Sequence, residues 1–592
     1  PSGITGKIIG NGIYMSSANS FNVEIVEDDL MRSMGKAVND VSLLPKQCKH
    51  GYIVKISNSR QSDEDDYYLR FEGLNDKDGT GSWVECAKPG IDLSLTNMPL
   101  VIQRTSLANG GTSTELATFT IKQFEYADRE IGDENTNPFP SFEGKRVNKV
   151  LFFRNRLAFL AGENVVLCRP GTLGRPDFFS ETALTVSAND PIDISCSSNF
   201  PSELFDGIDI NSGLVVFSSN QQFLLSSDDT VLNPDTAKLR SISTFNYNKD
   251  IPPISLGTTV AYLDNSGKFS RFNEMANIAR EGEPNVVNQS QVVPTLIPKN
   301  VDLFTNSREN NLVLIGKTDS DEVQGFRYLN VGDKRQQSAW FKWKFNNPLK
   351  YHFVINDEYY FLDTDNFLQE VRLVQTESDP AIIQDNVDYL LHIDNHVEIT
   401  GGQFDHPTNK TTFSGQNWLN SVTTPNYDLV VIDTNTASTR VGRYAKATIS
   451  GTSFTVPGDW SGASIFVGYL YEYKVLFPTF YLTQTQGESA RADVNSSLVI
   501  HRMKLHFGKI GLYETTLSRI GKNDYTEVYE STELDEYDVS DAPYVDEFIK
   551  TIPVYERNTN VDITLKSQHP APSTLRAVSW EGDFSPKYYK RV

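Results

Sequence analysis

Short apolar runs that end in turn-forming residues recur between residues 148 and 374 and constrain this chain more than any other feature. The run LFFRNRLAFL, for example, is interrupted by Arg154 and Asn155. Asn and Asp tolerate the left-handed torsions of tight hairpins, and the flanking Val, Phe and Tyr favour strands. The turn centres lie near Asn155, Asn220, Asn265, Asp319 and Asp357. The pattern predicts a succession of antiparallel hairpins.

The spacing of these turns indicates how the hairpins are grouped. Successive centres lie roughly 40 to 65 residues apart, which brackets the three or four strands of a propeller blade. We therefore predict an irregular β-propeller over residues 141–375. A stack of meandering β-sandwiches would give much the same spacing and stays open as the alternative.

The flanking regions have different patterns, so the chain is expected to be mainly β with three domains. Residues 1–140 predict a small mixed α/β domain, and residues 376–592 predict a C-terminal β-rich, sandwich-like region. A helix is expected near residue 34, because acidic residues precede apolar side chains at helical spacing. These side chains are Leu30, Met34, Ala37 and Val38.

Charge and cysteine content exclude several classes of protein. The chain has 76 acidic and 54 basic side chains, a formal net charge of −22, which is the wrong sign for a protein that grips nucleic-acid phosphates. Cys48, Cys86, Cys168 and Cys196 form no close pair, so buried free thiols are expected. The absence of a long apolar run or a leader predicts neither a membrane span nor a signal peptide, and therefore a cytosolic origin.

Catalytic and nucleotide-binding motifs are missing. The sequence contains no phosphate-binding loop, no G-x-S-x-G elbow and no H-E-x-x-H pair. We predict no catalytic residues, no cofactor-binding residues and no metal ligands.

Two expected strands contain histidines. In LHIDNHVEIT, His392, Asp394, His396 and Glu398 occupy alternate positions and would share one strand face. The simpler interpretation is a solvated polar face, with the intervening apolar residues facing the core. His501 and His506 are five residues apart, so we expect them on opposite sides of a strand and not as a pair.

Three acidic segments also need an interpretation. Asp76, Asp78 and Gly79 resemble part of a calcium loop but lack its later ligands, so a turn is expected. Residues 62–66 (SDEDD) are interpreted as a solvated hairpin tip. Residues 524–547 contain ten carboxylates and no basic residue, interleaved with tyrosines. A solvated face is the favoured interpretation. An electronegative surface facing a polyanion, or a glycosidase carboxylate pair, remains the alternative. The tyrosines are Tyr525, Tyr529, Tyr537 and Tyr544.

An ordered series of motifs resembles tail tubular protein B, the nozzle protein of short-tailed bacteriophages (podoviruses). The series comprises VLFFRNRLAFLAGENVVLCRPG, then DFFSETALTVSANDPIDISCSSN, then GLVVFSSNQQFLLSS. GYIVKIS, YYLRFEG and NPFPSFEGKRVNKV fit upstream, and KRQQSAWFKWKF and AVSWEGDFS fit downstream. The resemblance therefore covers nearly the whole chain and is weakest over residues 400–460 and after residue 523. Members of the family have a further N-terminal portion, so this chain is expected to be N-terminally incomplete.

The resemblance implies a structural virion protein and not an enzyme. It implies a homohexameric ring at the distal end of the tail that conducts and gates genomic double-stranded DNA during ejection. The implied partners are the adaptor ring called tail tubular protein A, the tail fibre protein and the host outer surface. Trp340, Phe341 and Trp343 are expected in the core or at a subunit interface. The alternative function is a carbohydrate-binding or polysaccharide-degrading tail protein, which would need two carboxylates facing each other across an aromatic-lined groove.

Overall fold

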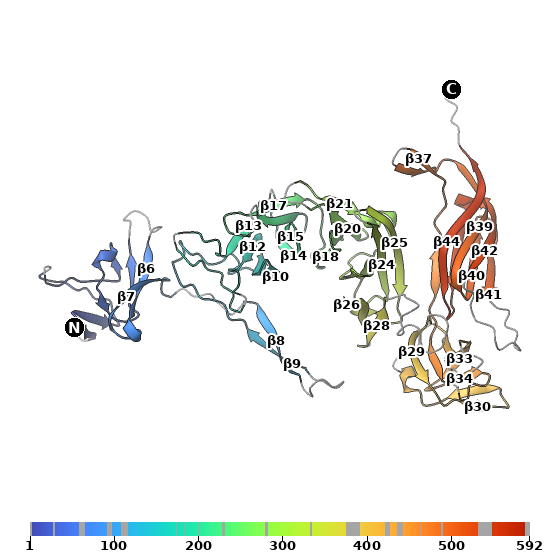
Figure 1. Cartoon of the computed structure of the whole chain (residues 1–592), viewed down its shortest axis with the longest axis horizontal. Coiled ribbons are helices and arrows are strands. Elements are labelled where there is room, and N and C mark those ends of the chain that lie inside the picture. The colour runs from blue at the N-terminus through green and yellow to red at the C-terminus, as the bar shows by residue number, and fades with distance from the viewer. Residues whose placement is uncertain are drawn as a thin grey trace, which may run out of the picture. The chain divides into compact units, whose positions relative to one another are not determined.

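The computed structural model describes most of the chain, and its regular secondary structure consists almost entirely of strands (Figure 1). The described residues are 1–592 except 1–2, 28–29, 58–65, 91–97, 108–116, 173, 184, 199, 228–230, 279–281, 332–333, 374–390, 421–426, 435–441, 463, 487–488, 531–546 and 587–592. In this part of the chain the only helices are short 3-10 turns, such as η4 (Gln289–Val292). None of them is long and apolar enough to span a membrane.

The helix expected near residue 34 is wrong. Leu30 is exposed, and Ala37 and Val38 form strand β3 (Ala37–Val38), which pairs in parallel with β5 (Ile53–Ile56). Gly35 weakens a helix at this point, and an extended backbone gains a hydrogen bond from the Lys55 amide to the Lys36 carbonyl. The N-terminal region is therefore β-structured over its described residues and is not mixed α/β.

The chain divides into two compact units. The first comprises residues 1–344 and 348–371, and the second comprises residues 345–347 and 372–592. The three-domain division made from the sequence stays a prediction.

The first unit begins with a hairpin and a five-stranded sheet. The hairpin pairs β1 (Ile4–Ile9) with β2 (Gly12–Ser17), and the sheet has the order β3-β5-β6-β7-β4. Its other strands are β4 (Gln47–Cys48), β6 (Tyr67–Gly73) and β7 (Gly79–Cys86). A small core of Val54, Ile56 and Leu69 packs beneath Trp83.

Five antiparallel meanders follow one another along the rest of this unit, and each sheet consists of consecutive strands. Sheet 1 has β10 (Val147–Phe153), β11 (Arg156–Ala161), β12 (Asn164–Leu167) and β13 (Ile192–Ser195). Sheet 2 has β14 (Leu204–Ile210), β15 (Gly213–Ser218), β16 (Gln222–Ser227) and β17 (Ala237–Ser243). Sheet 3 has β18 (Ile254–Ser255), β19 (Val260–Asp264), β20 (Arg271–Ala276) and β21 (Asn285–Asn288). Sheet 4 has β22 (Leu303–Ser307), β23 (Leu312–Gly316), β24 (Glu322–Val331) and β25 (Lys334–Lys344). Sheet 5 has β26 (Leu349–Ile355), β27 (Glu358–Asp363) and β28 (Leu368–Arg372).

Consecutive sheets share hydrophobic cores. One cluster joins sheet 1 to sheet 2, a second joins sheet 2 to sheet 3, and a third joins sheet 3 to sheet 4. The ring of Trp343 lies 5.8 Å from that of Tyr359, which connects sheet 4 to sheet 5. The middle strands β15, β16, β19 and β23 are buried along their whole length because a neighbouring sheet covers each of their faces. This explains why the sequence shows continuous apolar runs there instead of alternation.

Over its described residues, the second unit has two large hydrophobic cores and one smaller cluster. A seven-stranded sheet with the order β29-β35-β32-β33-β34-β31-β30 encloses one of them. Its strands are β29 (Asp394–Ile399), β30 (Gln403–Asp405), β31 (Lys410–Phe413), β32 (Leu429–Asp433), β33 (Tyr444–Ser450), β34 (Ser453–Pro457) and β35 (Ile465–Tyr469).

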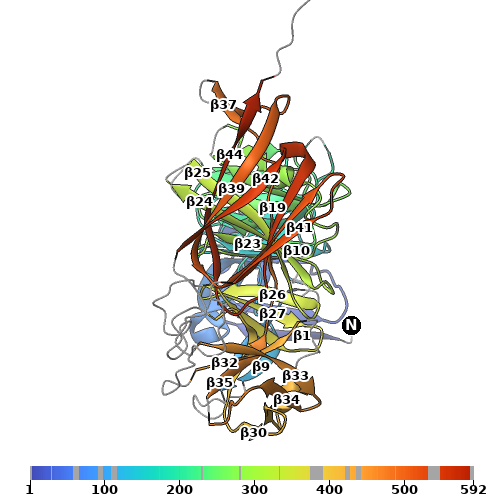
Figure 2. The same cartoon turned by 90° about the vertical axis from the view of Figure 1, so that its right-hand side faces the viewer.

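The other core lies between two sheets, which is the packing expected of the predicted sandwich-like region. The first sheet has the order β36-β43-β40-β41, and the second has the order β42-β39-β44 (Figure 2). Their strands are β36 (Tyr473–Leu476), β39 (Ser497–Ile510), β40 (Leu512–Arg519), β41 (Tyr525–Glu530), β42 (Phe548–Arg557), β43 (Val561–Ser567) and β44 (Ser573–Ser585).

Candidate functional surfaces

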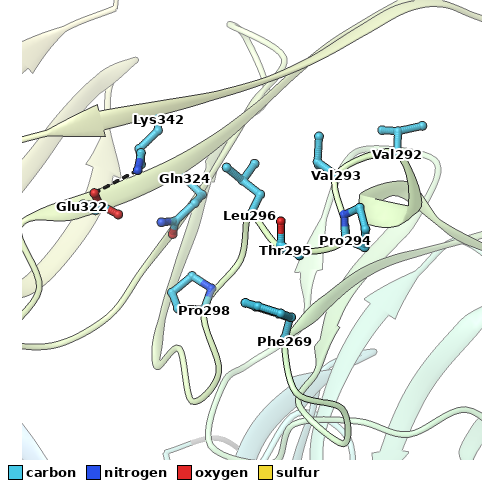
Figure 3. Close-up of a pocket in the computed structure, with 10 residues that line it drawn as sticks. All are labelled: Phe269, Val292, Val293, Pro294, Thr295, Leu296, Pro298, Glu322, Gln324 and Lys342. Atoms are coloured by element: carbon cyan, nitrogen blue, oxygen red, sulfur yellow. Dashed lines mark hydrogen bonds and ion pairs between the residues drawn. The ribbon is translucent and has the colours of Figure 1, made fainter. Parts of the chain in front are cut away.

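A groove of about 590 Å³ lies where the segment after η4 passes strands β24 and β25 (Figure 3). Leu296, Pro298 and Phe269 form apolar walls, and Gln324 projects from β24 into the groove. The remaining lining residues are Val292, Val293, Pro294, Thr295, Glu322 and Lys342.

The polar groups of this groove are not arranged for hydrolysis. Gln324 is 1% exposed, and no described donor reaches its Oε1 atom. Glu322 is the one carboxylate in the lining, and it accepts a hydrogen bond of 2.9 Å from Lys342. Glycoside hydrolysis needs two carboxyl groups on either side of the scissile bond. Among the described residues, the lining of the groove contains no such pair.

The four polar residues from His392 to Glu398 do not alternate along one regular strand face as expected. The register of β29 against β35 shifts between Asp394 and Val397, and Asn395 has a left-handed φ of 49°. The His392 ring stacks on Tyr471, at 6.1 Å between centroids. The bulge breaks the two-residue period on which the shared face depended. No group of three His, Cys, Asp or Glu residues in the described ranges could hold a metal ion.

His501 and His506 lie on the same side of β39, so the expectation of opposite sides is wrong. The register of β39 shifts between Ile500 and Arg502, and one extra residue there reverses the alternation. His501 lies 3.3 Å from Asp583, and His506 shares a 2.9 Å hydrogen bond with Ser579. The two histidines therefore have separate partners.

The acidic turns near the N-terminus have structural partners. Asp78 forms an ion pair of 2.5 Å with Lys7 and accepts a hydrogen bond from the His50 amide. These contacts lower the pKa of the Asp78 carboxyl. Asp66 is not the solvated residue that we expected, because it is 1% exposed and lies 2.6 Å from Lys55. The rest of the 62–66 segment lies outside the described residues.

Most of the acidic segment 524–547 also lies outside the described residues. At its ends, Asp524 accepts a hydrogen bond from Ser518 and Glu547 forms a 2.8 Å ion pair with Arg576. Glu527 forms an ion pair with Lys550. The solvated-face interpretation of the whole segment stays a prediction.

The predicted core tryptophan Trp340 and the four cysteines are buried or packed in cores. Trp340 packs on the core between sheets 3 and 4, and its indole N–H donates to the Gln289 carbonyl at 3.1 Å. The Phe341 ring lies 5.2 Å from that of Trp343. All four cysteines are free and buried, as predicted, and burial raises the pKa of the Cys86 thiol to about 11.

Two arginines, the half-buried Arg335 and the buried Arg156, were not identified from the sequence. Arg335 forms a bidentate ion pair with Glu274, at 2.5 and 2.9 Å, which joins sheet 4 to sheet 3. Arg156 is 2% exposed and donates to backbone carbonyls, including that of Asp190 at 2.7 Å and that of Leu232 at 3.4 Å. Their partners lie up to 76 residues away, so no local sequence pattern could have indicated them.

Solved structures align with this chain only at low TM-scores. BamB from Moraxella catarrhalis aligns with a TM-score of 0.23 and 13% identity, and the alignment covers 39% of this chain and 59% of that chain. Hsv2 from Kluyveromyces lactis aligns with a TM-score of 0.26 and 9% identity, and the alignment covers 57% and 90% of the two chains. These scores are too low to establish a shared fold.

Sequence comparisons identify the family. The chain is 23% identical over 519 residues to tail tubular protein gp12 of Escherichia phage T7, which covers 84% of this chain and 61% of that protein. It therefore spans about three fifths of the length of this relative. The family described as bacteriophage nozzle protein matches residues 2–591. The chain belongs to the bacteriophage nozzle protein family and is a structural component of a phage tail, not an enzyme.

Proposed function

We propose that this chain assembles as a homohexameric ring and forms the distal tubular nozzle of a short-tailed phage. The nozzle conducts and gates genomic double-stranded DNA during ejection, meets the adaptor ring above it and carries the tail fibres. The observation that carries this proposal is the match of the nozzle family to nearly the whole chain.

The net charge of −22 supports a conduit better than a binder. Carboxylates along a channel repel phosphates, so that DNA slides without being held by attractive contacts. At physiological salt the Debye length is about 8 Å, which confines this repulsion to close approach. We therefore propose that carboxylates outnumber basic side chains along the channel.

The succession of packed meanders supports an irregular propeller as the framework of each subunit. Four-stranded sheets that pack face to face are the units of which propellers are built. Six copies in a closed ring would use head-to-tail contacts, in which two different patches of each copy meet.

The copy number in the particle tests the ring. Cross-linking of purified tails, followed by mass measurement, should give a ladder of products that ends at six chains. Isolated monomers in otherwise intact tails would overturn the proposal. The rival function predicts that the protein cleaves host polysaccharide and that replacing one specific carboxylate abolishes this cleavage. We expect no cleavage of polysaccharide.

A further inference from the structure

Strands β8 (Leu100–Leu107) and β9 (Ala117–Gln123) form a two-stranded ribbon, which we call the arm (Figure 1). They pair antiparallel with each other, and within the described structure no third strand joins them. The sequence did not predict the arm as a separate element, because its strands are of mixed polarity.

The base of the arm is fixed to the rest of the first unit. Met98 precedes β8 and Tyr126 follows β9, and both side chains are buried in the cluster that covers sheet 1. The Tyr126 hydroxyl donates to the Pro99 carbonyl at 3.2 Å. The position from which the ribbon extends is therefore defined by a packed core.

One face of the arm is apolar. Ile102 lies directly opposite Ile121, and Arg104 lies opposite Phe119, so these side chains project to the same side. Leu100, Ile102, Phe119 and Ile121, which we call the apolar face, are between 60% and 68% exposed. The other face carries Val101, Gln103, Thr120 and Lys122.

The exposed apolar face of the arm is typical of a surface that binds another molecule. A two-stranded ribbon is at best marginally stable in water, and contiguous exposed apolar side chains mark sites of protein association. Large aliphatic and aromatic side chains with an arginine beside them are typical of the buried centre of a stable interface. The arm therefore has the chemistry of a permanent contact and not of a solvated hairpin.

Charge indicates what the partner is. The two strands of the arm contain Arg104 and Lys122 and no acidic residue, whereas the whole chain has a net charge of −22. A basic, apolar ribbon on an acidic protein is complementary to the surface of a second copy. Phosphates would match the basic residues but not the apolar face, which disfavours DNA as the occupant.

We propose that the apolar face of the arm docks on the neighbouring copy in the ring. This inference rests on the proposed function, because it names the element that makes one side of the head-to-tail contact. The arm reaches from a rigid base to an adjacent subunit, so it ties consecutive copies together.

A photo-crosslinking amino acid at position 102 in phage particles tests the proposal, with position 103 on the opposite face as the matched control. Irradiation should give a product of twice the mass of the chain from position 102 and little of it from position 103. Replacing both Ile102→Asp and Ile121→Asp should reduce incorporation into tails by at least about tenfold, since the burial of one isoleucine alone corresponds to that factor. The control pair Gln103→Asp and Thr120→Asp should assemble normally.

The outcomes separate this inference from the proposed function. A ring in which position 102 reacts with another tail protein, with lipid or with DNA would overturn the docking proposal and leave the nozzle intact. The same holds if the Ile102 and Ile121 double variant assembles like the wild type. Particles in which the copies form no ring would overturn both.

Discussion

An ion pair between Glu274 and Arg335 joins two sheets of the first unit. The Glu274 carboxylate lies in sheet 3 and accepts hydrogen bonds from Thr259 and Gln289 in addition to the Arg335 guanidinium of sheet 4. The Arg335 guanidinium also lies 4.7 Å from the centre of the Tyr328 ring. Removing one partner would leave the other charge buried without its counter-ion, which costs more than the pair itself contributes.

We expect Arg335→Met to lower the free energy of unfolding of the first unit by about 2 to 4 kcal/mol. This is somewhat less than for a fully buried pair, because the Arg335 side chain is 20% exposed. Denaturant unfolding followed by tryptophan fluorescence measures the change. Lys342→Met removes one partner of an exposed pair and should cost under about 1 kcal/mol. Equal losses in the two variants would show that the buried pair has no special role.

A buried histidine should make stability depend on pH. His352 is 3% exposed, its Nδ1 atom lies 3.1 Å from the Tyr359 hydroxyl, and burial lowers its pKa to about 4. As the pH falls, the His352 side chain becomes protonated near pH 6.5 in the unfolded chain but only near pH 4 in the folded chain. The free energy of unfolding therefore falls as the pH drops from about 6.5 to 4, by up to about 3 kcal/mol.

His352→Asn should remove this part of the pH dependence, although it also lowers stability at pH 7. Unfolding by urea at several pH values between 7 and 4 provides the test. The control is the wild-type protein unfolded under the same conditions. An unchanged slope in His352→Asn would contradict the assignment.

At the level of strands and turns, the sequence predicted local structure well where local torsions decide it. Arg154 and Asn155 have left-handed φ values of 45° and 62° in the tight turn between β10 and β11. Asn356 and Asp357 also have left-handed φ values, of 49° and 64°, in the turn between β26 and β27. The predictions that failed depended on continuity over several residues. The bulges in β29 and β39 shift the two-residue period of side-chain direction. Val38 pairs with β5 in a sheet instead of forming part of a helix.

Two features could not be predicted from the sequence: the arm, and the groove beside Gln324. Both depend on which other segments of the chain cover a given side chain. Gln324 is buried by a segment that arrives from sheet 3, and the exposure of Ile102 follows from the absence of a third described strand. The periodicity of a strand does not show which segment covers it or whether another strand pairs with its edge. The family resemblance, in contrast, rested on ordered motifs and was confirmed by the match over residues 2–591.

Close approach of strands within sheet 2 gives a prediction at this scale. A Cβ atom on Gly213, at the start of β15, would lie 2.2 Å from the Leu225 carbonyl oxygen of β16. Neither atom can rotate away, so Gly213→Ala should destabilise the first unit by about 1 to 3 kcal/mol. Thermal unfolding followed by circular dichroism measures this loss. A Cβ on Gly174 meets no atom within 4 Å, and Gly174→Ala should be nearly neutral. A Gly213→Ala protein as stable as the wild type would contradict the packing described.

At the scale of the whole chain, the two compact units have separate cores and should unfold separately. Calorimetry should resolve more than one transition, since cooperative two-state behaviour is a property of single small domains. Met503→Ala in the second unit and Val313→Ala in the first each remove a fully buried side chain. Each should shift a different transition. A single transition that both variants shift equally would show that the units are thermodynamically coupled.

The most direct test of the account is a reconstruction of the intact phage tail at subunit resolution. We predict six copies of this chain around an axial channel at the distal end, with more carboxylates than basic side chains facing the channel. A single unassociated copy, or copies placed away from the DNA path, would contradict the nozzle function.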